Sequence, residues 1–128
     1  MERTLTQAGD ASPEEVWRRY ADLGEWSRWA PFIQAVDSAG RELVPGLTGT
    51  VIAVGGLRVG FEVLAVDATA RTWRWCARLG TVSLVLDHEV AVRPAGGAIA
   101  VLAISGAAPV VLSYLLPAQL ALRSLVRV

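Results

Sequence analysis

Few residues of this 128-residue chain have side chains suited to catalysis, and the one histidine, His88, is the first candidate. It lies in the stretch SLVLDHEVAV (83–92), where Val and Leu alternate as in a β-strand with one apolar face. His88 falls on that apolar face. Burial there lowers the pKa of an imidazole and keeps it neutral, the form that acts as a general base. Three roles stay open: acid–base catalysis, contact with a ligand, or a structural hydrogen bond to the backbone or to water.

Tyr114 is the second candidate, because its hydroxyl can reach the same interior as His88 from an apolar C-terminal segment. The hydroxyl can hold a substrate carbonyl or the imidazole; alternatively, the ring is core and the hydroxyl lies at the surface. Ser105 and Ser113 are weaker candidates, because no acid stands behind His88 to complete a Ser–His–Asp triad. Asp87 adjoins His88 in sequence, but neighbouring residues of a strand point to opposite faces.

Tryptophan is the second distinctive feature of the sequence. The chain has five, which are Trp17, Trp26, Trp29, Trp73 and Trp75. Trp26 and Trp29 share one side if their segment is helical, and Trp73 and Trp75 share one face of a strand. Large flat rings on one wall suit stacking against an aromatic or polycyclic ligand. The alternative is that the five rings simply fill a core.

The predicted hairpins decide which residues share the histidine's face. A turn at Leu79-Gly80, or over residues 78–81, pairs Trp75 with Leu84 and Trp73 with Leu86, and directly opposed residues share a face. The polar and charged residues of both strands then lie on the opposite face of the sheet. We therefore expect both indole rings on the same wall as the histidine.

The next hairpin is predicted to turn over residues 94–97, which pairs His88 with Ala103 and Val90 with Val101. A small neighbour beside the imidazole leaves room for a ligand or water. The residues predicted to contact a ligand are Trp26, Trp29, Phe32, Phe61, Trp73, Trp75, Leu84, Leu86, Val101 and Ala103.

The strand-like run 57–67 extends this wall. The same alternation predicts that Phe61, Val63 and Ala65 face inward and that Glu62 faces solvent. Glu62 is then a surface partner for an arginine of the next strand, Arg74 or Arg78.

Composition excludes several classes of partner and cofactor. The 12 basic and 12 acidic residues give zero formal net charge, so we expect no nucleic-acid partner. One cysteine and one histidine cannot form a zinc site, and no pair of acids is spaced to suggest another metal. The glycine-rich run VGGLRVG (54–60) lacks the following helix and lysine of a phosphate-binding loop. We predict no metal and no cofactor.

A long uncharged stretch raises the question of a membrane span. Residues 98–122 carry no charge and are long enough to cross a bilayer. Small residues, the break at 106–109 and Pro117 instead favour a strand followed by an apolar helix. The first ten residues have no apolar core like that of a signal peptide. We expect a cytoplasmic protein with no membrane partner.

The order of elements predicts one α+β domain over residues 1–128. Ser12 is a helix N-cap, Pro13 the first helical residue, and Glu15 completes a capping box. Gly24 ends this helix, and a short second helix or turn reaches Pro31. Strand-like runs are RTLTQAG, PFIQAVDS, LTGTVIAV, LRVGFEVLAVD, RTWRWCAR, VSLVLDHEVAVR and AIAVLAIS, and the final APVVLSYLLPAQLALRSLVRV is helical in length and residue choice.

Taken together, the chain resembles the SRPBCC superfamily of START-like, helix-grip proteins, in its polyketide cyclase/dehydrase-like branch. The resemblance is carried by ASPEEVWRRYADLGEWSRWAPFIQAV, RTWRWCARLGTVSLVLDHEV and RPAGGAIAV, and it covers nearly the whole chain. It implies a curved seven-stranded antiparallel sheet around a long C-terminal helix, with two short helices after the first strand. Sheet and helix would enclose an apolar cavity.

The resemblance also implies a function in binding a hydrophobic, polyketide or aromatic small molecule. In a polyketide cyclase or dehydratase of secondary metabolism, His88 would act as acid–base and Tyr114 as an orienting hydroxyl. A non-catalytic carrier or sensor of a lipid or aromatic ligand is the first alternative. The second is an interaction module that uses the apolar C-terminal helix in a homodimer or on a membrane.

Overall fold

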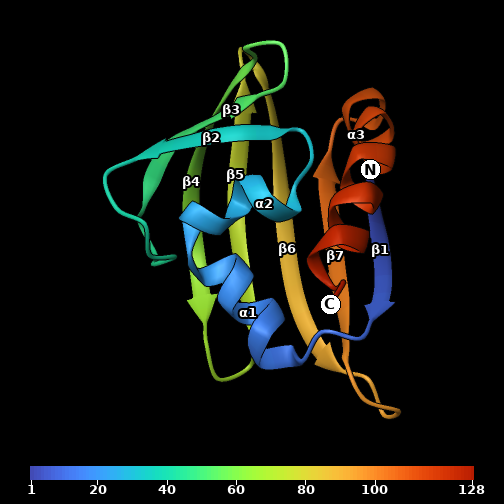
Figure 1. Ribbon diagram of the computed structural model, residues 1–128. Helices are drawn as coiled ribbons and strands as arrows, with labels where there is room; N and C mark the ends of the chain where they lie inside the picture. Colours follow the sequence, from blue (N-terminus) through green and yellow to red (C-terminus); the bar gives the residue numbers. More distant parts are fainter.

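The computed structural model describes residues 1–128 as a curved antiparallel sheet with three α-helices on one of its faces (Figure 1). The strands are β1 (Glu2–Gly9), β2 (Ile33–Ser38), β3 (Thr48–Ala53), β4 (Arg58–Asp67), β5 (Thr72–Leu79), β6 (Val82–Val92) and β7 (Ala98–Gly106). The helices are α1 (Pro13–Ala21), α2 (Trp26–Trp29) and α3 (Ala108–Leu125), and a 3₁₀ turn at Leu23–Glu25 joins the first two. The predicted α+β helix-grip architecture is confirmed.

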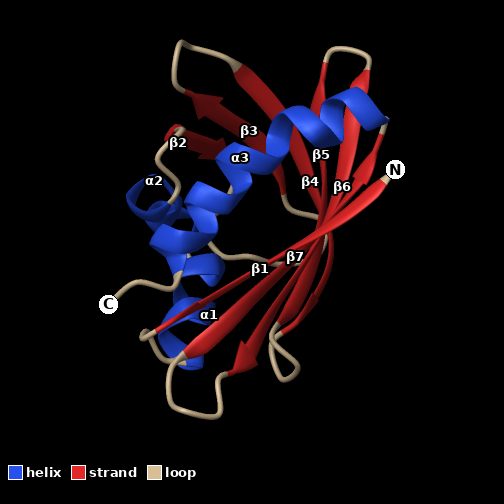
Figure 2. Ribbon diagram, turned by 90° about the vertical axis from the view of Figure 1, so that its right-hand side faces the viewer, coloured by secondary structure: helices blue, strands red, loops and turns tan.

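The sheet is one continuous ladder in the order β1-β7-β6-β5-β4-β3-β2, with every neighbouring pair antiparallel. Figure 2 shows α3 crossing the inner face of this sheet diagonally, with α1 and α2 on the same side. The hydrophobic core lies between the sheet and the helices. A ligand site enclosed by this fold must therefore lie under α3.

The first helix begins as its sequence predicts. The Ser12 hydroxyl accepts a hydrogen bond from the Glu15 backbone N–H at 3.1 Å, and Pro13 occupies the first turn. Val16 and Tyr20 are buried on the inner side of α1. The helical spacing thus directs Tyr20 toward the sheet.

The β5–β6 hairpin is tighter than predicted, because its loop holds two residues instead of four. Trp75 pairs with Leu86 and Trp73 pairs with His88. The predicted partners are therefore wrong by two positions. A shift of two keeps every side chain on its face, so both indole rings do share the inner wall with the imidazole.

The β6–β7 hairpin differs from the prediction by one position, and this reverses a face. His88 pairs with Leu102, and Ala103 pairs with Asp87 on the outer face. Val101 also lies on that outer face, so the placement of Val101 and Ala103 on the cavity wall is wrong. The loop between the paired residues Val92 and Ala98 has five residues, whereas the predicted pairing leaves six. Gly96 and Gly97 in this loop both take positive φ, at 100° and 90°, which permits the shorter connection.

A bulge in β4 corrects a second prediction. The register with β5 shifts between Val63 and Ala65, so β4 carries one extra residue there. Phe61 and Val63 are buried as predicted, but Ala65 is exposed and Val66 packs against the core in its place.

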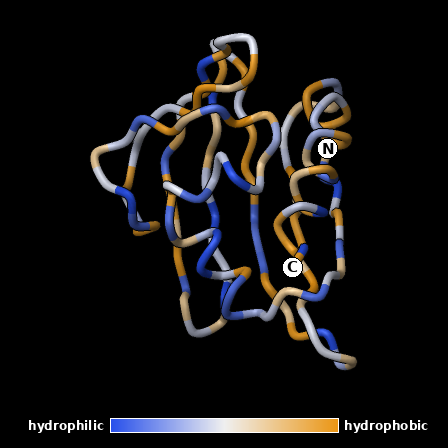
Figure 3. The backbone as a smooth tube through the Cα atoms, viewed as in Figure 1, coloured by the Kyte–Doolittle hydropathy of each residue, from blue (hydrophilic) through white to orange (hydrophobic).

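Helix α3 is continuous from Ala108 to Leu125, so Pro117 does not interrupt it. Figure 3 shows it as mostly apolar along its length, whereas α1 is largely hydrophilic. By length and composition alone α3 could cross a membrane, a test that the core helix of a soluble protein also passes. Its inward residues Val111, Ala118, Leu122 and Leu125 belong to the core of this domain.

Candidate functional site

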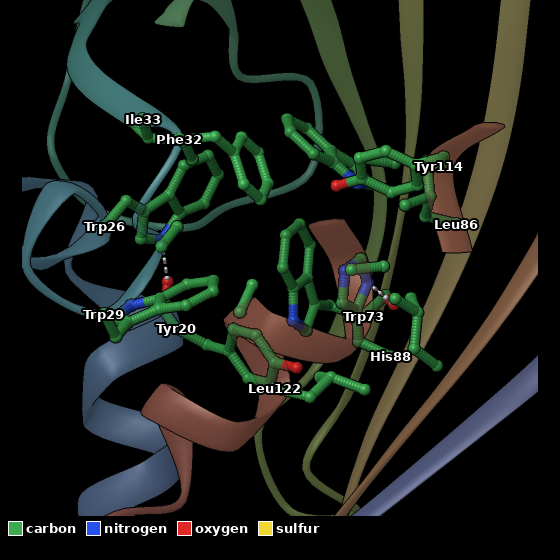
Figure 4. A pocket seen from close by; sticks show the side chains of 15 residues that line it. Tyr20, Trp26, Trp29, Phe32, Ile33, Trp73, Leu86, His88, Tyr114 and Leu122 are labelled. Atoms are coloured by element: carbon green, nitrogen blue, oxygen red, sulfur yellow. Dashed lines mark hydrogen bonds between the residues drawn. The ribbon is translucent and has the colours of Figure 1, made fainter. Parts of the chain in front are cut away.

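A small apolar cavity of about 40 Å³ lies between the sheet and α3 (Figure 4). Fourteen of its fifteen lining residues are hydrophobic, and the exception is His88. The lining consists of Tyr20, Trp26, Trp29, Ala30, Phe32, Ile33, Trp73, Trp75, Leu86, His88, Leu102, Tyr114, Ala118, Ala121 and Leu122. A space of this size holds a few water molecules at most.

The structure brings most of the residues selected from the sequence to this one place. Eight of them line the cavity, namely Trp26, Trp29, Phe32, Trp73, Trp75, Leu86, His88 and Tyr114. Phe61 is buried in the adjoining aromatic cluster, 5.1 Å from Trp75 between ring centres, and Leu84 packs half-buried at the edge of the core. Sequence reasoning missed Tyr20, although its spacing from Val16 already placed it on the buried side of α1.

His88 is held by the ring and the backbone of one residue, Trp73. The two rings stack with centres 3.8 Å apart and planes 8° apart, and the edge of Tyr20 completes the contact at 5.3 Å. The imidazole Nδ1 lies 3.3 Å from the Trp73 carbonyl oxygen. We assign the proton to Nδ1, which donates to that carbonyl and leaves Nε2 as the acceptor.

Burial also fixes the charge of His88. The side chain is 7% exposed, and desolvation lowers the pKa of the imidazole from its ordinary value near 6.5 to about 3. At neutral pH it is therefore uncharged. No carboxylate pairs with it inside the cavity, because Asp87 faces outward and accepts a 2.6 Å hydrogen bond from Arg74. That hydrogen bond raises the pKa of Arg74, which pairs with Asp87 and not with Glu62 as the sequence suggested.

The tryptophan rings pack against one another beneath the cavity. Trp26 lies 5.7 Å from Trp73 in a stacked arrangement and 5.3 Å from Trp75 edge-on. Its indole N–H donates to the Tyr20 carbonyl at 2.9 Å, and that of Trp29 donates to the Arg19 carbonyl at 2.9 Å. The rings thus act both as the cavity wall and as a large part of the core.

Three half-buried aromatic residues bound the cavity where it approaches the surface: Trp29, Phe32 and Tyr114. The rings of Phe32 and Tyr114 meet edge to face, 6.0 Å apart, across the gap between the α2–β2 connection and α3. Burial raises the pKa of the Tyr114 hydroxyl to about 12, so it is a neutral hydrogen-bonding group. We call these three residues the mouth.

The residues at this site offer no ligand set for a metal. Nowhere in the chain do three or more His, Cys, Asp or Glu side chains gather closely enough to bind an ion. The chemistry available in the cavity is therefore stacking, burial of apolar surface, and hydrogen bonding by neutral indole, hydroxyl and imidazole groups.

Solved structures share this fold. A protein from Nitrosospira multiformis superposes with a TM-score of 0.82 at 16% identity, covering 98% of this chain and 94% of its own. A protein from Mesorhizobium loti gives 0.82 at 16% identity, with 98% and 93% covered. Ara h 8.0201, a Bet v 1-like protein, gives 0.78 at 13% identity, with 98% and 94% covered.

Sequence comparison adds a family. A search of curated proteins finds no match. The family model described as "Polyketide cyclase / dehydrase and lipid transport" matches residues 3–123, nearly the whole chain. With its helix-grip fold and its apolar cavity under the C-terminal helix, this chain belongs to the polyketide cyclase/dehydrase and lipid transport family of SRPBCC-type proteins.

Proposed function

We propose that this protein binds a compact, apolar aromatic molecule between the sheet and α3, as a carrier or sensor. The observation that carries the proposal is the cavity itself, which is apolar, walled by tryptophan rings and bounded by three half-buried aromatic side chains. Rings of this kind stack on flat ligands and gain free energy by burying apolar surface. The family to which the chain belongs is associated with hydrophobic ligands.

The size of the cavity limits how the ligand enters. An apolar cavity that binds benzene has a volume of about 150 Å³, whereas this one measures about 40 Å³. A ligand of one or two rings must therefore displace side chains, and those of the mouth are the ones already in partial contact with solvent. Binding therefore requires the side chains of Phe32 and Tyr114 to move apart.

A titration followed by tryptophan fluorescence tests the proposal, with tetralin and 1-tetralone as probes. Native mass spectrometry of the purified protein looks in parallel for a co-purified small molecule. We expect saturable quenching by a probe, because four of the five indole rings line the cavity. Lack of response to every neutral aromatic probe, with no co-purified molecule, rejects the function.

Two variants of α3 sharpen this test. Ala118→Leu fills the space beneath the helix, since Ala118 is 1% exposed and lines the cavity. We expect it to abolish binding while the protein stays folded. Leu116→Ala is the matched control, because Leu116 lies on the same helix with 69% of its surface exposed. It should bind as the unaltered protein does.

Cyclisation or dehydration of a polyketide is the second candidate function, and it is favoured by His88 and Tyr114 lining one cavity. In this mechanism Nε2 of the neutral imidazole removes a proton from carbon, and the Tyr114 hydroxyl holds a carbonyl oxygen. A pKa of about 3 makes the imidazole a weak base, which supports binding over catalysis. If the protein is an enzyme, His88→Ala keeps ligand affinity and loses turnover.

A further inference from the structure

Three polar groups end inside the aromatic wall without a hydrogen-bond partner in the protein. They are the Tyr20 hydroxyl and the indole N–H groups of Trp73 and Trp75. All three residues are nearly or fully buried, at 1%, 3% and 8% exposure, and all three line the cavity. In contrast, the indole N–H groups of Trp26 and Trp29 are both satisfied by backbone carbonyls.

Such groups reduce stability, because each has given up hydrogen bonds to bulk water and no protein group replaces them. Phenylalanine in place of Tyr20 would avoid that cost and still supply the ring that packs on Trp29, Trp73 and His88. The core packing of Tyr20 therefore does not account for its hydroxyl. A ligand that brings a hydrogen-bond acceptor into the wall does account for it.

Two of these donors belong to rings that are in direct contact. The rings of Tyr20 and Trp73 meet edge to face with centres 5.4 Å apart. Figure 4 shows the hydroxyl of Tyr20 and the indole nitrogen of Trp73 directed toward the same part of the site. A carbonyl oxygen has two lone pairs and can accept from both.

The charge of the site selects a neutral acceptor. Its lining contains no Lys, Arg, Asp or Glu, and the imidazole of His88 is uncharged at neutral pH. A carboxylate or phenolate placed here would be a buried charge without a counterion, which is strongly unfavourable. A ketone, quinone or ester oxygen carries no such penalty.

We propose that the ligand of this cavity is a neutral aromatic carbonyl compound, whose oxygen accepts hydrogen bonds from the Tyr20 hydroxyl and the Trp73 indole N–H. The Trp75 indole N–H is a further donor on the same wall for a ligand with a second oxygen. This inference rests on the proposed binding function and adds the chemical class of the ligand.

A matched pair of probes tests it. 1-Tetralone and tetralin share one ring skeleton and differ only in a carbonyl in place of a methylene group. We expect the protein to bind 1-tetralone about tenfold more tightly than tetralin, which corresponds to one or two net hydrogen bonds. The anion of 1-naphthoic acid should not bind at pH 7.

Tyr20→Phe separates the hydrogen bond from the packing, because it removes one oxygen and keeps the ring. We expect the variant to bind 1-tetralone several-fold more weakly, to bind tetralin unchanged, and to melt at a higher temperature without ligand. Equal affinity of the unaltered protein for both probes, with no selective loss in Tyr20→Phe, overturns the inference and leaves the binding function standing. Failure of both probes to bind overturns the two together.

Discussion

At the scale of single residues, His88 shows how an imidazole is accommodated on a wall of Val and Leu. Its ring face stacks on the indole of Trp73, and its Nδ1 meets the carbonyl of the same residue. The structural hydrogen bond considered from the sequence is therefore present, in a residue that also lines the cavity. The alternation of apolar residues in β6 was enough to place His88 on the apolar face. It could not identify the residues paired with His88 on β5 and β7, because that pairing depends on the lengths of the connecting loops.

The buried imidazole makes stability depend on pH. Its folded-state pKa, about 3, lies below the ordinary value of 6.5, so between these values the unfolded chain binds more protons than the folded one. The free energy of unfolding is therefore highest well above pH 6.5, and it falls as the pH drops from there toward 3. Urea unfolding should show a loss of about 2 kcal/mol from pH 7.5 to pH 5.

His88→Gln is the control for this prediction, since it removes the only histidine of the chain. The variant should lose most of the pH dependence in that window. The carboxyl group of Glu15, whose pKa is lowered to about 2 by its hydrogen bond with Arg18, affects stability only at lower pH. An equal slope in both proteins would assign the effect to another group.

At the scale of elements, strands and helices were predictable because hydrophobic period and helix capping are local properties of the sequence. The register between neighbouring strands could not be predicted in the same way. Two glycines with positive φ shorten the β6–β7 loop and move Val101 and Ala103 to the outer face, and a bulge in β4 does the same to Ala65. One residue gained or lost reverses a face, so cavity-lining positions are predicted less well than strands.

Pro117 is a feature of α3 that we expect to lower the free energy of unfolding. It lies inside α3 and has no backbone N–H to donate to the Ser113 carbonyl. Pro117→Ala restores that hydrogen bond and should raise the free energy of unfolding by about 1–3 kcal/mol. Chemical denaturation measures the change, with the exposed neighbour Leu116→Ala as a control that should stay close to the unaltered protein. An unchanged free energy of unfolding in Pro117→Ala would show that the helix accommodates the proline without a loss of stability.

At the scale of the whole molecule, α3 is attached mainly by its C-terminal half. Arg19 of α1 donates hydrogen bonds to the carbonyls of Leu125 and Arg127, both at 2.6 Å, and the Ala11 N–H donates to the Val126 carbonyl at 3.1 Å. The end of β1 approaches closely enough that a Cβ at Gly9 would meet the Val126 carbonyl oxygen at 2.2 Å. These contacts tie the end of the helix to the start of the chain.

The N-terminal half of α3 makes fewer buried contacts and hydrogen bonds with the rest of the molecule. Its N-cap, Ala107, makes no side-chain hydrogen bond, and Val111 is its one fully buried residue. Tyr114 lies in this half, and Pro117 separates it from the buried half that follows. The mouth of the cavity is therefore closed by the less stable part of the helix, as expected where a ligand must enter.

Hydrogen exchange should resolve the two halves of α3. We expect the amides of residues 110–116 to exchange at least about tenfold faster than those of residues 118–125, because local opening of the first half breaks few buried contacts. Saturation with 1-tetralone should slow exchange in the first half only, since a ligand that contacts Tyr114 stabilises the closed state. Equal exchange along the whole helix would show that α3 opens as a single unit, in which case the ligand must enter by a movement of the α2–β2 connection around Phe32.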